Sequence, residues 1–314
     1  MKTNADIPAL LQQYAGALKT RSHEAHKGTY GRLLILAGSP GMAGAAYLAG
    51  LAAFRCGIGM VKYLGPECNR PVLQTLLPEA MYESLPENAG GCSLETYREK
   101  LMESISWGDY MILGPGLSRS AEAKRLVRTL FTPAAGEILR QKKLIIVDAD
   151  ALNIMAEHGL DPGRLGPAAV ITPHIVEMSR LCGISPKETE ERQNEIAAEY
   201  AKAHGVAVVL KSARTAVSAG DDFWLLDSGC GAMAKAGSGD VLCGFIAGIT
   251  AVAAAAAGTD DGTNLKEILG DTLPLAVHLH GRAGCIAAGH KGEHSILARD
   301  IAEAAGEALA EAAE

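Results

Sequence analysis

With 314 residues the chain is long enough to bury a large core, either in one big α/β domain or in two smaller ones. Apolar residues make up 48% and charged residues 21% of the sequence, which is typical of a folded protein and excludes a disordered one. The formal net charge of −7 argues against nucleic-acid binding, because that requires a clustered positive surface. Any phosphate ligand must therefore be held locally.

The cysteines and the apolar segments predict a cytoplasmic protein without a membrane partner. Seven cysteines lie far apart with no Cys-x-x-Cys pair, which indicates reduced thiols. Residues 1–19 contain no long apolar run after a basic stretch, so we expect no signal peptide. Residues 241–257 are apolar but fall short of the roughly 20 residues that a membrane-spanning helix needs, so a core helix is expected there.

Strands and helices alternate through the first half of the chain. Residues 32–37 form a short apolar run that is followed by helical spacing over residues 43–55. The same pattern of an apolar run, a turn and a helical segment recurs at residues 110–113, 144–147 and 169–171. Such alternation predicts a mainly parallel central sheet that is covered by helices on both faces. Ligands of these sheets gather at the carboxyl ends of the strands.

The second half begins with closely spaced apolar runs at residues 206–210, 215–218 and 223–226. A Gly-Asp-Asp turn separates the last two runs, so we expect a small antiparallel portion at the edge of the sheet. No internal repeat or low-complexity linker is present. We therefore expect one domain over residues 1–314, with residues 1–25 as an N-terminal helical extension.

The remainder of the sequence predicts three helices separated by two breaks. The helices are expected at about residues 240–257, 264–288 and 295–312, with breaks at residues 260–262 and 289–293.

A Gly-Ser-Gly-Asp turn at residues 237–240 stands directly before the apolar helix. Two glycines allow the backbone to form a nest of N–H groups, and the start of a helix adds partial positive charge, so the turn can bind phosphate. Asp240 falls in the first helical turn, where the macrodipole favours an ionised carboxylate. The alternative is that Asp240 merely caps the helix.

Several other polar residues follow predicted strands. Lys211 comes directly after residues 206–210, where a lysine is either a solvated surface group or a ligand of phosphate. Asp148 and Asp150 follow the strand at residues 144–147, and each could cap a helix or face the ligand crevice.

Two further segments have both a functional and a purely structural interpretation. Gly114-Pro115-Gly116 is either a plain turn or a point of close ligand approach. His174 and Glu177 are three apart on an expected helix start, so they could share a crevice-facing side or simply begin the helix. The sequence has no Walker P-loop, no Gly-x-Gly-x-x-Gly after the first strand and no nucleophile elbow, which argues against Rossmann dehydrogenases and α/β-hydrolases.

Taken together, these segments resemble the ADP- or ATP-dependent NAD(P)H-hydrate dehydratases, a branch of the ribokinase-like superfamily. The resemblance runs in order from about residue 27 to 284. It rests on Lys27-Gly28-Thr29-Tyr30-Gly31, Ala37-Gly38-Ser39, Met42-Ala43-Gly44-Ala45, Gly114-Pro115-Gly116-Leu117, Val147-Asp148-Ala149-Asp150-Ala151-Leu152-Asn153, Thr172-Pro173-His174, Val209-Leu210-Lys211 and Met233-Ala234-Lys235-Ala236-Gly237-Ser238-Gly239-Asp240.

The resemblance implies a ribokinase-like fold and an enzyme that repairs hydrated NADH and NADPH by acting on the S epimer. It implies that the hydrated dinucleotide contacts Ala45, Gly116, His174 and Asp240. It implies that the adenine nucleotide contacts Lys211, Ser212, Ala213, Arg214, Thr215 and Gly239, while Gly237 and Ser238 complete the phosphate turn. Asp240 is then the catalytic base, and ADP or ATP with Mg²⁺ supplies the phosphoryl group; the metal ligands are not assigned.

Two departures from the family pattern concern the nucleotide side. Residues 229–233 read Gly-Cys-Gly-Ala-Met where the family often has Gly-Asn-Pro-Gly-Met, and Ser212 stands where Gly is usual. Relatives often form tetramers, so a homo-oligomer is expected. The alternatives are a kinase of the same superfamily that phosphorylates a vitamin precursor, and a nucleotide-binding module without catalysis.

Overall fold

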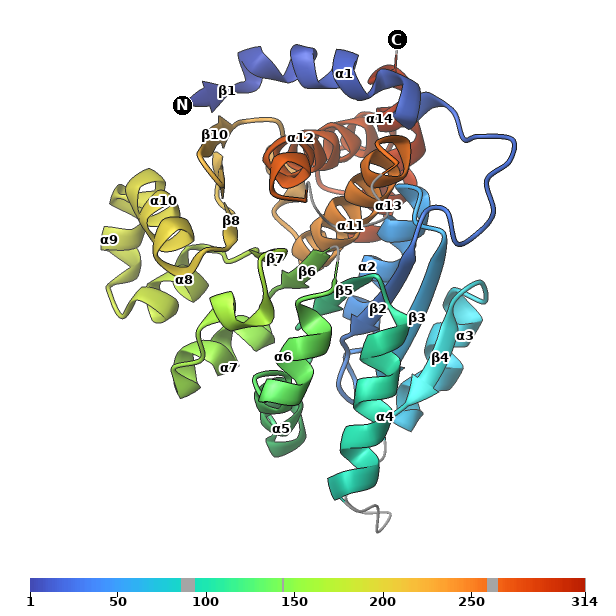
Figure 1. Ribbon diagram of the computed structural model, residues 1–314. Coiled ribbons are helices and arrows are strands. Elements are labelled where there is room, and N and C mark those ends of the chain that lie inside the picture. Colours follow the sequence, from blue (N-terminus) through green and yellow to red (C-terminus); the bar gives the residue numbers. More distant parts are fainter. Residues whose placement is uncertain (86–93, 143, 259–264, 314) are drawn as a thin grey trace.

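The computed structural model describes residues 1–85, 94–142, 144–258 and 265–313. In this part of the chain, ten strands form one sheet in the order β1-β10-β9-β8-β7-β6-β5-β2-β3-β4 (Figure 1). All neighbours from β8 to β4 are parallel, whereas β8, β9 and β10 pair antiparallel. The parallel strands are β2 (Arg32–Leu36), β3 (Met60–Gly65), β4 (Met81–Ser84), β5 (Tyr110–Leu113), β6 (Leu144–Val147), β7 (Ala169–Ile171) and β8 (Ala207–Leu210).

The predicted mainly parallel sheet with an antiparallel portion at its edge is therefore confirmed. The antiparallel portion contains β9 (Thr215–Ala219) and β10 (Asp222–Leu226), which a Gly220 turn with φ of +61° connects. The N-terminal segment adds a short strand, β1 (Lys2–Thr3), parallel to β10 and followed by the helix α1 (Ile7–Lys19). Strands β3 and β4 were not predicted from the sequence.

Helices cover both faces of the sheet, as Figure 1 shows. Alternate residues of β2 belong to different cores: Leu33 and Ile35 pack on one face, and Leu34 and Leu36 on the other. The first face carries α1, α2 (Ala43–Arg55), α11 (Ser238–Ala256), α12 (Leu265–Lys291), α13 (Ala298–Glu303) and α14 (Ala305–Glu311). The second carries α4 (Leu94–Trp107), α5 (Ala121–Leu130), α6 (Pro133–Leu139), α7 (Asp150–His158), α8 (Ile175–Cys182) and α10 (Gln193–His204). The helices α3 (Arg70–Leu76) and α9 (Pro186–Glu191) lie nearer the ends of the sheet.

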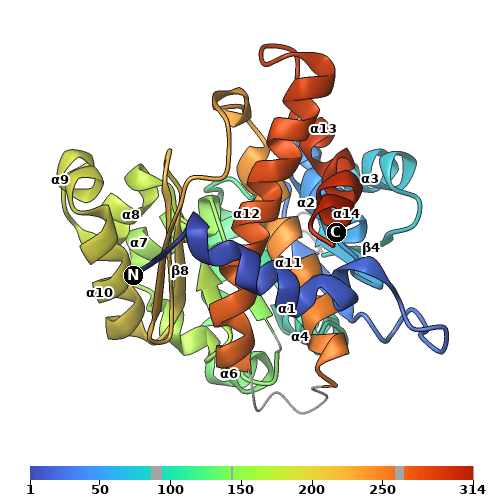
Figure 2. The ribbon, with the colours of Figure 1, turned by 90° about the horizontal axis from the view of Figure 1, so that it is seen from above.

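Helix α11 is the centre of the first face, and it packs closely on α2. A β-carbon on Gly244 would lie 2.4 Å from the carbonyl oxygen of Ala49, and one on Gly248 would lie 2.4 Å from Cys56 Cβ. Glycine therefore permits the close approach of the two helices. Among the described residues α11 is the one helix long and apolar enough to cross a membrane, but 78% of its apolar window is buried inside the protein, as expected of a core helix. Figure 2 shows α1 lying across α11 and α12.

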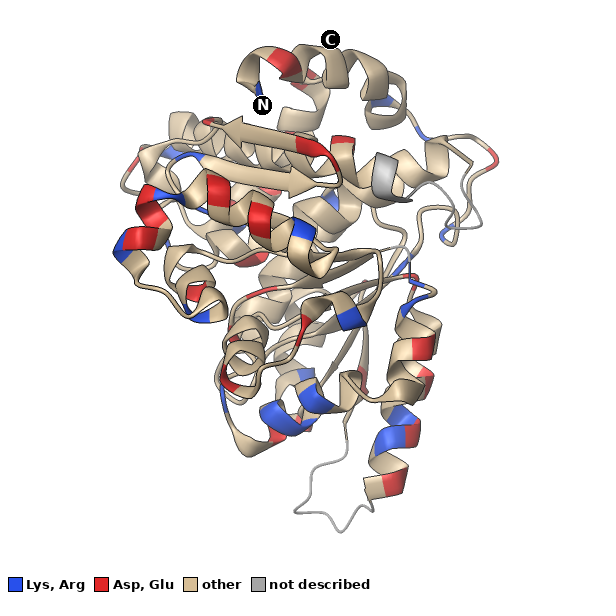
Figure 3. Cartoon of the chain, turned by 60° about the vertical axis from the view of Figure 1, so that its left-hand side comes forward, with Lys and Arg blue, Asp and Glu red and all other residues tan. Residues whose placement is uncertain are grey.

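The C-terminal helices differ from the prediction in two respects, and the first is that α12 continues to Lys291, inside the predicted break at residues 289–293. The expected helix at residues 295–312 is instead two helices, α13 and α14, which meet at Ala304. Both helices pack on α2 and α12, but α13 also contacts α11, whereas α14 also contacts α1. The predicted break at residues 260–262 lies outside the described residues. Charged residues of both signs are interspersed along the outer helices in Figure 3.

Candidate active site

A cavity of about 770 Å³ lies beyond the carboxyl ends of β6, β7 and β8, between the start of α11 and the middle of α12. We call it the Lys211 cavity. Its walls include the predicted residues His174, Lys211, Ser212, Ala213, Thr215, Ser238, Gly239 and Asp240. The predicted residues Arg214 and Gly237 are not among its lining residues, although Gly237 belongs to the phosphate turn.

The predicted phosphate turn opens into this cavity. Gly237 precedes α11 with φ of +93°, and a β-carbon there would lie 2.5 Å from Leu48 Cδ1, so the position requires glycine. The N–H of Ser238 donates to the carbonyl of Lys235, and the N–H of Val241 donates to the carbonyl of Gly237. The N–H groups of Gly239 and Asp240 belong to the first turn of the helix, where no intrahelical acceptor is available. They therefore suit an anion in the cavity.

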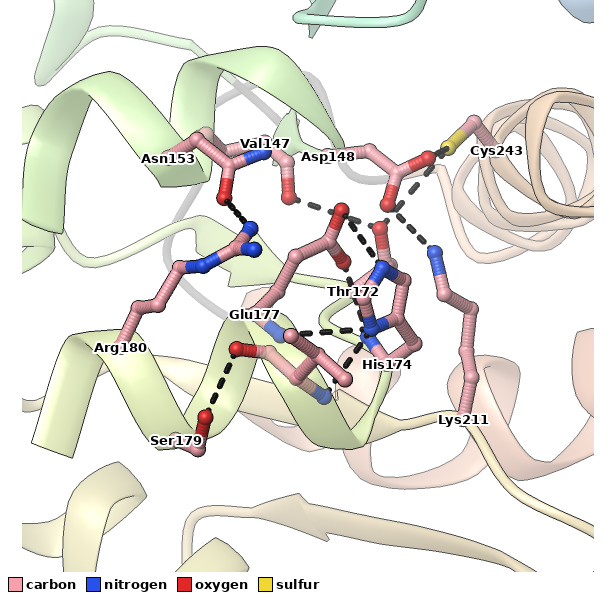
Figure 4. Close-up of polar contacts among 11 residues, drawn as sticks. Val147, Asp148, Asn153, Thr172, His174, Glu177, Ser179, Arg180, Lys211 and Cys243 are labelled. Carbon is pink, nitrogen blue, oxygen red and sulfur yellow. Dashed lines mark hydrogen bonds and ion pairs between the residues drawn. The ribbon is translucent and has the colours of Figure 1, made fainter. Parts of the chain in front are cut away.

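An ion pair between Lys211 and Asp148 forms the floor of the cavity. Lys211 Nζ donates to Asp148 Oδ1 over 2.5 Å, and the Asp148 side chain is only 1% exposed (Figure 4). A β-carbon on Gly239 would lie 3.3 Å from the same Nζ, so the ammonium lies directly against the phosphate turn. Burial alone lowers the pKa of Lys211, but the charges of Asp148 and Glu177 outweigh this and raise it above its ordinary value. Lys211 thus remains a cation.

The structure shows whether Asp148 and Asp150 face the ligand crevice or begin a helix, which the sequence left open. Its carboxylate faces the crevice, where it accepts from Lys211 and, over 3.5 Å, from the Cys243 thiol of α11. The following residue, Ala149, has φ of +54°, an uncommon conformation for a residue with a side chain. Asp150 instead begins α7 and accepts the backbone N–H of Ser118 over 2.7 Å. The two aspartates therefore point to different neighbours.

Asp240 lines the cavity from the first turn of α11. Its pKa is raised from 3.8 to about 7, mainly by burial and then by the negative charge of Asp148, with Lys211 acting in the opposite sense. The helix start therefore does not keep Asp240 fully ionised near neutral pH, because burial opposes the effect of the helix dipole. A carboxylate with this pKa can accept a proton at physiological pH.

His174 and Glu177 serve both of the roles that the sequence suggested. His174 caps α8, because its Nδ1 accepts the backbone N–H groups of Val176 and Glu177 over 3.1 and 3.2 Å. Glu177 completes the capping box by accepting the N–H of His174 over 2.9 Å. Both side chains also line the Lys211 cavity. Burial raises the pKa of Glu177 to about 7, and burial followed by the charge of Lys211 lowers the pKa of His174.

The remaining predicted substrate residues, Ala45 and Gly116, are neighbours of each other but do not line the Lys211 cavity. A β-carbon on Gly116, whose φ is +60°, would lie 2.9 Å from Ala45 Cβ, so the loop after β5 touches the first turn of α2. The loop after β2 also contacts Gly116, since the N–H of Ser39 donates to the carbonyl of Gly116 over 2.7 Å. These two residues thus lie further along the carboxyl edge of the sheet, over β2 and β5.

Sequence reasoning placed residues 229–233 on the nucleotide side but missed the wall of the cavity that α12 supplies. The loop after β10, residues 227–231, and three residues of α12, Val277, His280 and Gly281, also line it. His280 is buried, and burial lowers its pKa to about 4, although a hydrogen bond to the backbone of Ser238 opposes this. Gly281 permits the contact with the loop, since a β-carbon there would lie 2.6 Å from the backbone of Ser228. The sequence carries no local signal for the α12 part of this wall, because it depends on how α12 packs beside the loop after β10.

The chain matches known proteins over most of its length. The family profile described as NAD(P)H-hydrate dehydratase covers residues 33–306. A bifunctional NAD(P)H-hydrate repair enzyme of Moorella thermoacetica is 37% identical over 90% of this chain; the chain spans about half the length of this relative, 50%. An ADP-dependent (S)-NAD(P)H-hydrate dehydratase of Bacillus subtilis is 32% identical over 95% of this chain and 96% of its own length.

Solved structures have the same fold. An Enterococcus faecalis protein described as ribokinase-like superimposes on this chain with a TM-score of 0.79 at 22% identity, and the match covers 99% of this chain and 96% of that chain. This similarity shows the ribokinase-like fold. An ADP/ATP-dependent NAD(P)H-hydrate dehydratase of Bacillus subtilis, co-crystallised with ATP and Mg²⁺, has a TM-score of 0.73 at 28% identity and covers 96% of this chain and 97% of its own.

Proposed function

The chain belongs to the NAD(P)H-hydrate dehydratase family, and from that premise we propose that it returns the S epimer of hydrated NADH or NADPH to the reduced dinucleotide. ADP or ATP is the phosphoryl donor. The observation that carries the proposal is the meeting of three groups in one cavity: the carboxyl of Asp240, the amide of Gly239 and the ammonium of Lys211.

The chemical problem is that hydroxide is a poor leaving group, since the pKa of water is about 15.7. Transfer of a phosphoryl group to the ring hydroxyl solves it. The hydroxyl oxygen forms a bond to the terminal phosphorus of the nucleotide while the bond between that phosphorus and its bridging oxygen breaks, so that ADP leaves when ATP is the donor, or AMP when ADP is the donor, and the hydroxyl proton passes to Asp240. The carbon–oxygen bond of the ring then breaks with the help of the ring nitrogen lone pair, phosphate leaves with that oxygen, and the neighbouring ring carbon loses a proton.

Several residues of the cavity have a role in these reaction steps. Asp240, whose pKa is about 7, accepts the hydroxyl proton. The N–H groups at the start of α11 and the Lys211 ammonium stabilise negative charge on the transferring group. Ser212 and Thr215, at the turn between β8 and β9, line the side of the cavity that would hold the rest of the nucleotide.

The residues also fit the Mg²⁺ ion that accompanies nucleotides. In the described ranges no three His, Cys, Asp or Glu side chains gather into a metal cage. The carboxylates of Asp148 and Glu177 nevertheless line the cavity as hard oxygen donors, which suits an ion held mainly by phosphates and water. When bound, Mg²⁺ would neutralise phosphate charge during transfer.

The proposal is tested by incubating the protein with hydrated NADH, Mg²⁺ and either ADP or ATP. We expect the reduced-nicotinamide absorbance to return, with one inorganic phosphate released for each dinucleotide, and only from the S epimer. The R epimer is the matched control. A stable phosphorylated product would instead indicate a kinase, and nucleotide binding without turnover would indicate a non-catalytic module.

A further inference from the structure

The loop after β10 lies directly against α12, and glycines of the helix permit the contact. A β-carbon on Gly281 would lie 2.6 Å from the backbone of Ser228. One turn further along the helix, a β-carbon on Gly284 would overlap the sulfur of Met233. The loop is therefore packed on α12 at residues 228 and 233, on both sides of Cys230.

Two cysteines meet at this contact. Cys285 lies four residues after Gly281 and so on the same side of α12, and its Sγ lies 3.9 Å from the carbonyl oxygen of Ser228. Cys230 follows Ser228 by two residues. Both thiols are free and only partly buried. Burial, followed by a hydrogen bond with the Cys230 thiol, raises the pKa of Cys285 to about 11, in keeping with two thiols that lie beside each other.

Cys230 is also open to small oxidants and able to move. In the part of the chain that the structure describes, it is the one cysteine that lines the Lys211 cavity, where peroxide dissolved in water can reach it. Its neighbours Gly229 and Gly231 give the backbone freedom, and a β-carbon on Gly231 would meet no atom within 4 Å. The loop can therefore shift toward α12.

We propose that Cys230 and Cys285 form a peroxide-sensitive pair whose disulfide weakens nucleotide binding in the Lys211 cavity. Cys230 Sγ attacks one oxygen of hydrogen peroxide, the O–O bond breaks, and water leaves with the thiol proton. Cys285 Sγ then attacks the sulfenic sulfur, the S–O bond breaks, and a second water takes the hydroxyl group and the Cys285 proton. The two sulfurs lose two electrons in total, and the peroxide is reduced to two waters.

The disulfide changes the wall of the cavity because it draws the loop onto the helix. A disulfide bond is about 2.05 Å long, far shorter than the separation of two thiols in van der Waals contact. Closing it moves Cys230, and with it the cavity wall of residues 227–231, toward α12. A nucleotide that fits the reduced wall binds the oxidised protein less tightly, and by linkage it opposes the disulfide by the same factor. This step rests on the proposed function, which makes the cavity the donor site.

Mass spectrometry tests whether the pair forms. The reduced protein is treated with hydrogen peroxide, the remaining thiols are alkylated, and the digest is analysed without reduction. We expect two peptides joined through Cys230 and Cys285, which dithiothreitol separates and which Cys285→Ala lacks. Cys68→Ala, which removes an exposed cysteine of η2 (Glu67–Asn69), is the matched control and should keep the cross-link. A wild-type digest without this cross-link, whatever else is oxidised, would overturn the proposal.

Calorimetric titration of ATP tests the consequence for binding. We expect Kd to be about tenfold higher for the oxidised than for the reduced wild type, within the ~5- to 150-fold range of ordinary coupling between sites. Peroxide-treated Cys285→Ala should bind ATP as its untreated form does. Equal Kd values for both forms of the wild type, or an equal loss in Cys285→Ala, would overturn the coupling. Neither measurement uses hydrated NADH, so a failure of this inference is distinguishable from a failure of the dehydration assay.

Discussion

The ionisation of Asp240 should control the pH dependence of turnover. Its pKa of about 7 predicts that about one-tenth of the molecules carry the ionised base at pH 6 and about nine-tenths at pH 8. Since the ionised form accepts the proton, turnover at saturating substrate should rise roughly tenfold between these values. An aspartate at its ordinary pKa of 3.8 would be ionised throughout, and the profile would be flat.

The substitution Asp148→Asn tests the physical origin of this pKa. Asp148 lies 2.5 Å from Lys211 Nζ, and its negative charge is the second cause of the raised pKa of Asp240. Removing that charge also leaves the Lys211 cation without its partner, and both effects favour the ionised base. The midpoint of the turnover profile should therefore move to lower pH.

The assay is initial-rate turnover of hydrated NADH with saturating ATP and Mg²⁺ from pH 5 to 9. Asp221→Asn, in the exposed turn between β9 and β10, is the control and should leave the midpoint where it is in the wild type. A flat wild-type profile would refute the assignment of the pH-dependent rise in turnover to Asp240. A midpoint that moves to higher pH in Asp148→Asn would refute the electrostatic reasoning behind the raised pKa.

Three further outcomes follow from the same geometry. Asp240→Asn should lower kcat by about 10² to 10⁴ with little change in KM, because a positioned base contributes that much to rate; steady-state kinetics measures it, and near-normal kcat would contradict it. Lys211→Met should lower the free energy of unfolding by about 3 kcal/mol in urea titrations, because it leaves the buried Asp148 carboxylate without a counter-charge; a second substitution, Asp148→Asn, should restore part of the loss. Gly237→Ala should destabilise by more than about 1 kcal/mol, because φ is +93° there, whereas Gly231→Ala, in the nearby loop with open space around it, should cost less; equal losses in thermal unfolding would argue against backbone strain.

Five of the parallel strands, β2, β5, β6, β7 and β8, could be predicted because they are buried on both faces and therefore appear in the sequence as continuous apolar runs. Strands β3 and β4 do not have this pattern. Lys62 interrupts β3, where its ammonium pairs with Glu83 of β4, and β4 is only partly buried at the end of the sheet. Their strand character comes from pairing with β2 and with each other rather than from local sequence.

The candidate site shows a similar division. The phosphate turn was predictable, because glycines, a helix start and an acidic residue are adjacent in sequence. The pKa of Asp240 was not, since it depends on burial and on Asp148, which a different strand supplies. The wall that α12 forms with His280 was also not predictable, because it depends on how α12 packs beside the loop after β10. Residues that are adjacent in the sequence can therefore be recognised from it, whereas a pKa that depends on distant residues can be worked out only from the fold.

Labelling the ring hydroxyl of hydrated NADH with a heavy oxygen isotope tests the central chemical claim most directly. If the hydroxyl is phosphorylated before it leaves, the label must appear in the inorganic phosphate, which mass spectrometry detects. Label found in water, with unlabelled phosphate, would show that nucleotide hydrolysis and dehydration proceed separately, and would contradict the roles assigned to Asp240 and the Gly239 turn.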